Sequence, residues 1–216
     1  MSRRKTYKYY GQFRDPQLDE YLHKKFFSRR KKGFFIEAGA HNGIDDSNCK
    51  FFEENGWSGI NIEPDPVIFN DLTNNRPEST NLNVGLGRPR DAGRRLPFTT
   101  VLDGEFHTGL GSFHLTDEDR ERYENEGRTL ETIDVQIVSY ANVIESYDVE
   151  KVDLFSLDVE GGEIDVITGM YGSSVLPKIM CVEYPRVTLK RLREALDILD
   201  YKYHSTVHNC AFFKRK

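Results

Sequence analysis

The sequence contains few cysteines. Its 216 residues include only Cys49, Cys181 and Cys210, an odd number with no metal-ligand spacing between them. Secreted disulfide frameworks and structural zinc sites need paired or closely spaced cysteines. Both classes are therefore disfavoured, and a reducing compartment such as the cytoplasm is the expected location.

Long apolar stretches are also absent. The N-terminal stretch MSRRKTYKYYGQFRDPQLDEYL has no apolar core of the signal-peptide type. No other stretch approaches the roughly 20 apolar residues that a membrane-spanning helix needs. We therefore expect a soluble protein without a membrane span.

An excess of positive charge is missing as well. The 30 basic residues are outnumbered by 35 acidic ones, which gives a net charge of -5. Nucleic-acid-binding proteins usually carry a basic field, so this balance argues against a nucleic-acid partner. Three basic runs remain, at Arg3–Lys5, Arg29–Lys32 and Lys214–Lys216, and such runs are typical of solvated faces and chain ends.

No linker or internal repeat divides the chain. The length and the hydrophobic fraction of 38% suit one core, so we expect a single domain over residues 1–216. Residues 1–32 precede the first apolar run and are expected to cover part of the site. Periodicity fades between residues 88 and 129, which predicts an irregular insertion of the kind that is often functional.

Short apolar runs alternate with amphipathic stretches, the pattern of a sheet wrapped by helices. Strands are expected at 33–39, 59–64, 80–87, 151–163 and 178–185, with helices near 47–55, 65–75, 163–171 and 187–200. Residues 133–149 predict a short strand and a helix. The end of the chain, YKYHSTVHNCAFFKRK, reads as two strands broken at His208 and Asn209, a terminal β-hairpin.

The loop after the first expected strand, in FFIEAGAHNGIDDSN, is glycine-bearing. In open α/β sheets, ligands bind beyond the carboxyl end of this strand. Gly39 and Gly43 allow close backbone approach there, but their spacing lacks the G-x-G-x-x-G of a pyrophosphate binder, which argues against NAD or FAD. The acid Glu37 would repel a pyrophosphate and could instead accept hydrogen bonds from an ammonium group, such as that of S-adenosylmethionine.

A second acid follows the second expected strand. Glu63 stands where a carboxylate accepts both ribose hydroxyls of a bound nucleoside in related folds. Taken alone, it could also be a helix-capping acid ahead of Pro64 and Asp65. With Glu37 and the two glycines, it favours a nucleoside cofactor with an amino-acid end.

Further acids follow the fourth and fifth strands, which end at the same edge of the sheet. The segment LDVEGGE brings Asp158, Glu160 and Glu163 close together, and Glu183 ends the next strand. Glu163 also suits the first turn of a helix, where an acid favours the helix dipole. Chemistry at a hydroxyl needs a general base or a cation that lowers the hydroxyl pKa, and carboxylates here could serve either purpose. In the metal-free alternative, Asp158 is the base and Glu183 pairs with Arg186.

Histidines offer another base, because their pKa lies near working pH. His41 is the strongest candidate since its loop adjoins the expected cofactor, and His107 and His114 fall in the insertion. The stretch GEFHTGLGSFH suggests a lid that covers the acceptor, with Ser112 or His107 touching it. On the other side, Tyr9, Tyr10 and Gln12 could close the site or belong to a frayed start; the single Trp57 is expected in the core.

Several motifs in order resemble the FkbM-type methyltransferase family, a branch of the class I S-adenosylmethionine methyltransferases. They are GFFIEAGAHNG, SNCKFFEENGWSGINIEPDP, NNRP and VDLFSLDVEGGEIDVITGM, and YYGQFRDPQLDEYLHKKFF also resembles the segment before the first strand in one branch. Departures are His41, where a small polar residue is common, and Cys49, where threonine is frequent.

The resemblance implies an α/β fold: a Rossmann-like, seven-stranded, mostly parallel sheet with helices on both faces and a C-terminal antiparallel β-hairpin. It implies S-adenosylmethionine as cofactor and O-methylation of a sugar or polyketide-like alcohol, with a deoxyhexose of a surface glycan as the favoured acceptor. The insertion at 88–129 would then lie over the acceptor site. Mg²⁺ or Mn²⁺ held by Asp158 and Glu183 is implied by other O-methyltransferases of this fold class.

The expected site therefore has three groups of residues. Catalysis is assigned to Asp158, His41 and Glu160, and metal binding to Asp158 and Glu183. Cofactor binding is assigned to Glu37, Gly39, Ala40, Gly43, Ser47, Asn48, Glu63, Pro64, Val84, Gly85 and Asp158.

Two other functions stay open at this point. One is an NAD(P)-dependent oxidoreductase on the same scaffold, and the other is a catalytically silent methyltransferase-like module that binds a partner. Acids gathered at several strand ends favour a working site over a silent one. The oligomeric state is left open.

Overall fold

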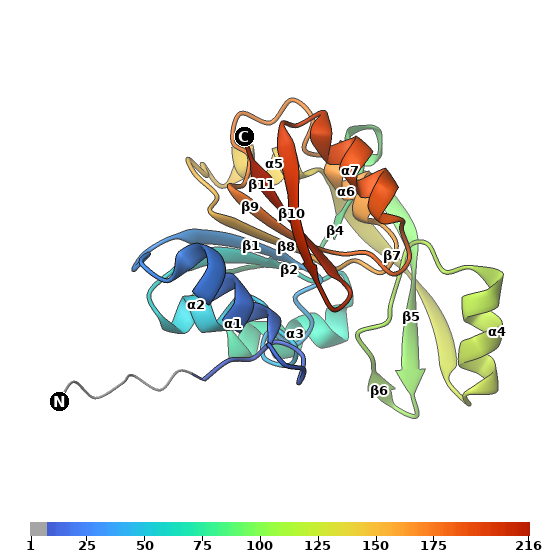
Figure 1. The fold of residues 1–216 in the computed structure, drawn as a ribbon. Coiled ribbons are helices and arrows are strands. Elements are labelled where there is room, and N and C mark those ends of the chain that lie inside the picture. The colour runs from blue at the N-terminus through green and yellow to red at the C-terminus, as the bar shows by residue number, and fades with distance from the viewer. Residues whose placement is uncertain (1–7) are drawn as a thin grey trace.

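The computed structural model describes residues 8–216, so the basic run at residues 3–5 and the start of the expected cover segment lie outside the described residues. Two sheets form the molecule (Figure 1). The main sheet consists of β1 (Phe34–Ala38), β2 (Ser58–Ile62), β3 (Thr80–Leu82), β8 (Leu154–Leu157), β9 (Ile179–Glu183), β10 (Tyr201–Val207) and β11 (Cys210–Arg215). The second sheet consists of β4 (Gly85–Leu86), β5 (Arg95–Asp103), β6 (Phe106–His107) and β7 (Thr129–Val138).

The main sheet has the order β10-β11-β9-β8-β1-β2-β3. Strand β1 lies inside the sheet and pairs in parallel with β2 on one side and β8 on the other. The last strand, β11, runs antiparallel between β9 and β10. The predicted fold class is confirmed, and the reversal of strand order at β1 places a ligand crevice at the carboxyl ends of β1, β2 and β8.

Helices cover both faces of the main sheet (Figure 1). They are α1 (Leu18–Leu22), the π-helix η1 (His23–Phe27), α2 (Lys50–Glu54) and α3 (Pro66–Asn75) on one face, and α5 (Tyr140–Ser146), α6 (Glu163–Thr168) and α7 (Leu189–Asp197) on the other. The 3-10 helix η2 (Pro89–Asp91) and α4 (Asp117–Asn125) belong to the segment between β4 and β7.

Side-chain alternation along the strands creates one core on each face. Phe35 packs into the cluster of α1, η1 and α2, which also contains Trp57, as predicted. The next residue, Ile36, packs into the cluster of α5, α6 and α7. Within residues 8–216, no helix combines the length and apolar character needed to cross a bilayer.

The sequence predicts one continuous strand at 80–87, and this prediction is wrong because the structure has two short strands there. The chain divides it into β3, which pairs with β2 in the main sheet, and β4, which pairs with β7 in the second sheet. Between them, the side-chain amide of Asn83 donates to the carbonyl oxygens of Glu63 and Pro64, at 2.9 and 3.0 Å. These bonds hold Asn83 against the end of β2, where the chain leaves the main sheet.

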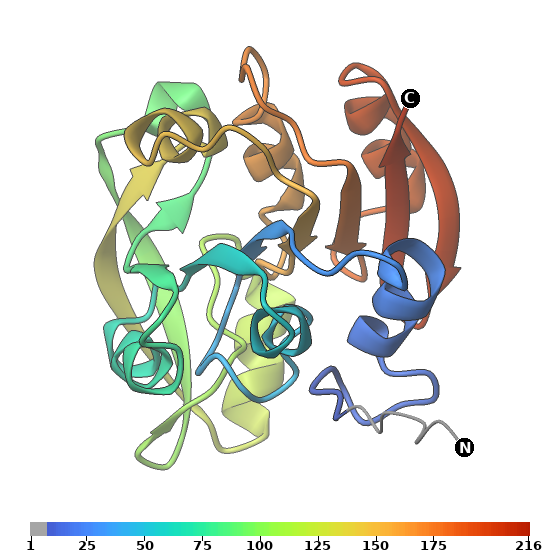
Figure 2. The same cartoon turned by 90° about the vertical axis from the view of Figure 1, so that its left-hand side faces the viewer.

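The segment 88–129 is not irregular, which corrects the sequence prediction. It contains the nine-residue β5, which pairs antiparallel with the ten-residue β7 over eight residue pairs, and helix α4. Thr116 caps this helix in a reciprocal capping box with Asp119. The expected short strand within 133–149 is the second half of β7. Figure 2 shows the second sheet standing beside the main sheet.

Candidate active site

A cavity of about 230 Å³ lies at the carboxyl edge of the main sheet, where the second sheet meets it. Gly39 and Glu63 line it from the ends of β1 and β2, and Asp158 lines it from the end of β8. The second sheet and its loops contribute Phe98 and His114. The cavity thus occupies the crevice that the strand order predicts.

Gly39 sets the distance between the β1 loop and the end of β8. Its φ is +77°, and a Cβ there would lie 1.7 Å from the carbonyl oxygen of Asp158. Its amide N–H donates to the carbonyl oxygen of Ile62 at 3.0 Å, as does that of Ala40. Only glycine fits this close backbone approach, which brings the loop and Asp158 to one wall of the cavity.

Glu63 is buried, yet it lines the cavity. One carboxylate oxygen accepts from the backbone N–H of His41 and the other from that of Asp65, both at 3.0 Å. Burial raises the pKa of Glu63 to about 7, against the opposing effect of these two bonds. A carboxylate oxygen carries more than one acceptor lone pair, so both oxygens can still accept a hydroxyl from a ligand.

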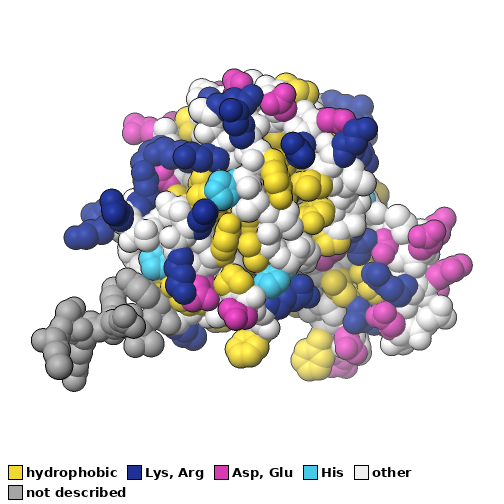
Figure 3. Space-filling view, in the orientation of Figure 1, with side chains coloured by type: hydrophobic (Ala, Val, Ile, Leu, Met, Phe, Trp, Pro, Cys, Tyr) yellow, Lys and Arg dark blue, Asp and Glu magenta, His cyan; other side chains and the backbone are white. Residues whose placement is uncertain are grey.

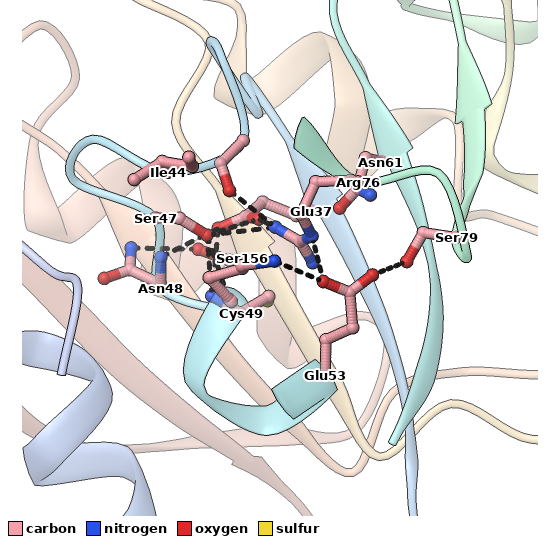
Figure 4. Close-up of polar contacts among 12 residues, drawn as sticks. Glu37, Ile44, Ser47, Asn48, Cys49, Glu53, Asn61, Arg76, Ser79 and Ser156 are labelled. Carbon is pink, nitrogen blue, oxygen red and sulfur yellow. Dashed lines mark hydrogen bonds and ion pairs between the residues drawn. The ribbon is translucent and has the colours of Figure 1, made fainter. Parts of the chain in front are cut away.

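Glu37, in contrast, does not line the cavity, and its expected direct contact with a cofactor ammonium is revised (Figure 4). Its carboxylate accepts from the Ser47 hydroxyl at 2.9 Å and from the backbone N–H groups of Asn48 and Cys49 at 2.8 and 3.1 Å. It also pairs with the fully buried Arg76 at 3.4 Å. Desolvation raises the pKa of Glu37 and Arg76 opposes that rise, so the carboxylate is a structural anchor of the loop.

Three other expected cofactor contacts belong to the same anchor. Ser47 and Asn48 are donors to Glu37, and the side-chain amide of Asn48 also donates to Ser156 at 3.1 Å. Gly43 leaves room for Arg76, because a Cβ there would lie 2.6 Å from the Arg76 Cγ. Arg76 in turn forms an ion pair with Glu53. Gly43, Ser47 and Asn48 therefore support the loop on the side away from the cavity.

The expected cofactor contacts thus fall into two groups. Glu37, Ala40, Gly43, Ser47 and Asn48 do not line the cavity. The residues that do line it are Gly39, Glu63, Pro64, Val84, Gly85 and Asp158.

Three carboxylates meet at the ends of β8 and β9. Asp158, Glu160 and Glu183 each offer an oxygen within 4.8 Å of the other two. Burial, followed by the nearby charge of Glu183, raises the pKa of Asp158 well above its usual range. Burial also raises the pKa of Glu160, although Arg186 opposes the rise. Burial and the closeness of the carboxylates therefore favour the protonated forms of Asp158 and Glu160.

Glu160 and Glu183 each accept a hydrogen bond from a different side chain outside the cluster. The Asn209 side-chain amide donates to Glu183, and the Arg186 Nε donates to Glu160 at 2.8 Å. The alternative pairing of Glu183 with Arg186 is therefore wrong. Arg186 also forms an ion pair with Asp119 and donates to the Tyr123 hydroxyl at 3.0 Å, so it links the acidic cluster to α4.

Glu163 has the structural role that its position suggests. It is the first residue of α6 and is buried. Its carboxylate accepts from the backbone N–H groups of Gly161 and Val159, at 3.1 and 3.3 Å. Burial raises its pKa, and its effect on the site is to hold the turn that carries Glu160.

The three histidines occupy different places. His41 lies beside Gly109, outside the cavity lining, and burial lowers its pKa. His107 Nδ1 lies 2.7 Å from a carboxylate oxygen of Asp65, so it ties the second sheet to the start of α3. His114 is the one histidine of the described chain that lines the cavity, with Nε2 3.6 Å from Asp165. We expected His41 to be the strongest candidate base among the histidines. His114 lies closer to the cavity and takes that place.

Two further predictions about the cover are also revised. The buried Ser112 hydroxyl donates to the Glu160 carbonyl oxygen at 2.7 Å, so it supports the acidic cluster and does not face an acceptor. Tyr9 and Tyr10 contact His23 and Glu54 through their hydroxyls, at 2.9 and 2.6 Å. The described part of the first 32 residues therefore packs on the face of α2.

Sequence reasoning missed Asp65 as an organiser of the site, and it paired Arg186 with Glu183 and not with Glu160. Asp65 caps α3 through the backbone N–H groups of Val67 and Ile68, and it also contacts Thr100 and His107 in the second sheet. The Asp-Pro start of a helix signals only the cap. The partners of both residues lie far away in sequence, so no local pattern could have revealed them.

Comparisons with known proteins agree with this architecture. Residues 37–203 match the family model described as "Methyltransferase FkbM domain". No curated protein matches the chain. Among solved structures, the METTL16 MTase domain is 11% identical with a TM-score of 0.51, and the match covers 92% of this chain and 65% of that one.

Other solved structures match at lower TM-score. The ribosomal protein L11 methylase from Lactobacillus delbrueckii subsp. bulgaricus is 10% identical with a TM-score of 0.46, covering 93% of this chain and 79% of that one. A TehB-like SAM-dependent methyltransferase from Corynebacterium glutamicum is 8% identical with a TM-score of 0.46, covering 92% and 87%. At such identities a structural match concerns the fold alone.

Proposed function

Because this chain belongs to the FkbM methyltransferase family, we propose that it transfers a methyl group from S-adenosylmethionine to a hydroxyl oxygen of a sugar or glycan. The family implies the cofactor. One observation supports the transfer to a hydroxyl in particular: Asp158 lines the cavity and also belongs to the cluster of three carboxylates. Family membership also removes the reason for proposing an NAD(P)-dependent oxidoreductase.

The cavity's residues fit the cofactor chemically. Glu63 is a buried acceptor with capacity for ribose hydroxyls, and Ile68 and Val84 give apolar walls for a flat base. Gly39 exposes backbone where a ligand's amino-acid end could approach. When bound, S-adenosylmethionine supplies an electrophilic methyl group on a sulfonium.

The acidic cluster provides the proton acceptor. A sugar hydroxyl stays protonated at neutral pH, so a base must remove its proton during transfer. A carboxylate with a raised pKa is a stronger base once it is ionised. We assign Asp158 as the base, with Glu160 and Glu183 beside it in the cluster. Orientation of the hydroxyl supplies much of the remaining rate.

The second sheet supplies the proposed cover of the acceptor site. Phe98 and Phe113 pack edge to face at 4.9 Å between ring centroids, and both line the cavity. An aromatic wall next to carboxylates suits a sugar, which has apolar C–H faces and polar hydroxyls. A deoxyhexose of a glycan combines these features.

We also propose that the protein works in the cytoplasm. Its three cysteines are buried and free, as is usual for proteins in a reducing compartment.

A divalent cation is the second candidate for activating the hydroxyl. Three carboxylate oxygens within 4.8 Å of one another are hard ligands of the kind that Mg²⁺ and Mn²⁺ accept. Asp158, Glu160 and Glu183 would hold the ion, which would lower the hydroxyl pKa. If so, Mg²⁺ raises the unfolding temperature of wild type but not of Glu183→Gln, and chelator abolishes activity. Full activity in the presence of chelator would exclude the cation and would leave the carboxylate as the group that activates the hydroxyl.

The experiment is a methyl-transfer assay with labelled S-adenosylmethionine and a panel of sugars and glycans, repeated with Asp158→Asn. We expect an O-methyl product, and a loss of turnover of about 10²–10⁴-fold in the variant with cofactor affinity retained. Asp103→Asn, an exposed change on β5, is the control. Methyl groups found only on nitrogen, or full turnover by Asp158→Asn, would refute the assignment.

A further inference from the structure

Lysine and arginine residues gather at the amino edge of the main sheet, the edge opposite the cavity. Strands β1, β8 and β9 run parallel, so the segments that precede them meet at this edge. We define the basic edge as Arg29, Arg30, Lys31 and Lys32 before β1, Lys151 before β8 and Lys178 before β9. In Figure 3, Lys and Arg side chains gather along the left and upper left of the molecule, where Figure 1 places the starts of these strands.

One buried carboxylate underlies half of this edge. Asp153, fully buried, forms ion pairs with Arg30, with Lys151 at 3.4 Å and with Lys178 at 3.2 Å. Burial alone would raise the pKa of Asp153, but Lys178, Arg30 and the Phe34 N–H hold it below its usual value. A single negative charge cannot neutralise three cations, so this cluster keeps a positive excess.

The other half of the edge has no acidic partner at all within residues 8–216. Arg29, Lys31 and Lys32 are exposed, and none of them forms an ion pair with a described residue. Phe26, Ser28 and the nearby cations line a shallow depression in this surface. Because the whole chain carries a net charge of -5, the positive charge here is a local concentration.

We propose that the basic edge docks the protein onto an anionic lipid surface. Clustered lysine and arginine side chains are attracted to anionic headgroups, and no exposed apolar anchor beside them is needed for weak, reversible binding. Docking by this edge would leave the cavity, at the opposite edge, open to its acceptor.

The local aromatic residues favour lipid over nucleic acid as the partner. Single-stranded nucleic acids bind to basic surfaces with exposed aromatic rings on which bases stack. Here the rings are already engaged, because Phe27 packs on Trp57 at 4.9 Å and Phe26 stacks on Phe212 at 6.1 Å between centroids. The basic edge therefore has charge without a stacking platform.

The test is co-sedimentation of the full chain with vesicles of phosphatidylcholine, with and without phosphatidylserine, at low and high salt. We expect binding only to the anionic vesicles, and its loss at high salt. Lys31→Glu/Lys32→Glu should weaken binding by about tenfold or more. The matched control is Lys190→Glu/Arg191→Glu, an equal charge change on exposed residues at the start of α7, near the opposite edge. This control should bind like wild type, and both variants should unfold at the wild-type temperature.

Three results would overturn the proposal. They are absence of binding to anionic vesicles at low salt, equal weakening by the two double variants, and tighter binding of a single-stranded RNA that Lys31→Glu/Lys32→Glu abolishes. The last result would make the same edge a nucleic-acid surface. None of these measurements depends on the methyl-transfer activity.

Discussion

Gly39 and Glu63 are the residues on which the cofactor assignment depends most. Both were predicted from the sequence, because a glycine and an acid at the ends of the first two strands fit a general rule for α/β sheets, and both line the cavity. Glu37 was expected to contact the cofactor, but it does not line the cavity. Its partner Arg76 lies 39 residues away, and no pattern in the sequence shows that this carboxylate is already neutralised inside the protein.

Replacing Gly39 with alanine should abolish cofactor binding. The new Cβ would collide with the Asp158 carbonyl oxygen and would stand at a positive φ that costs about 1–3 kcal/mol. The control is Gly104→Ala in the β5–β6 turn, which has a φ of +62° but nothing within 4 Å of the new Cβ. Calorimetry with S-adenosylhomocysteine should show lost binding only in Gly39→Ala; equal affinities of the two variants would contradict the close approach.

Glu63 predicts a pH dependence of cofactor affinity. Its pKa is raised to about 7 in the free protein, and ribose hydroxyls that donate to it favour the ionised form. Below pH 7 the carboxyl must lose a proton on binding, so affinity should fall by up to about tenfold per pH unit. Calorimetry between pH 5.5 and 8 in buffers of different ionisation enthalpy would show the released proton. Glu63→Gln should bind weakly with no such slope, and a slope that persists in it would assign the proton elsewhere.

At the scale of elements, the sequence predicted the strands that are buried on both faces. Strands β1, β2, β8 and β9 are short apolar runs, and their order along the chain fits successive βα units. Strand β5 was missed and only the second half of β7 was predicted, because much of β7 is exposed and the pairing joins segments that lie far apart in the sequence. Such pairing is stabilised by cross-strand contacts, which a local pattern does not record.

Arg186 joins two elements, α4 and the loop after β8, and its removal tests that link. Arg186→Met leaves Glu160 and Asp119 without their shared partner, which should cost about 2 kcal/mol of unfolding free energy and further raise the pKa of Glu160. Arg122→Met, which removes the more exposed partner of Asp119, should cost less than about 1 kcal/mol. Chemical denaturation measures both costs.

The same pair of variants separates positioning from stability. If Arg186 orients the acidic cluster, the pH profile of turnover moves to higher pH in Arg186→Met and stays unchanged in Arg122→Met. An unchanged pH profile in both variants would show that Arg186 stabilises the fold without orienting the acidic cluster.

At the scale of the whole molecule, the two edges of the main sheet differ in charge. The carboxyl edge carries the cavity and the carboxylates, and the amino edge carries the six lysine and arginine residues of the basic edge, three of which pair with Asp153. Composition alone gave only a net charge of -5, because it averages over both edges. The direction of each strand, which the fold supplies, separates the acidic edge from the basic one.

The most direct test of the central claim is calorimetric titration of the purified chain with S-adenosylmethionine, S-adenosylhomocysteine and NAD, alongside Glu63→Ala. We predict micromolar binding of both sulfur-containing ligands, none of NAD, and a loss of about tenfold or more in Glu63→Ala with its fold intact. Absence of binding by S-adenosylmethionine and S-adenosylhomocysteine, or unchanged affinity in Glu63→Ala, would contradict the assignment of this cavity.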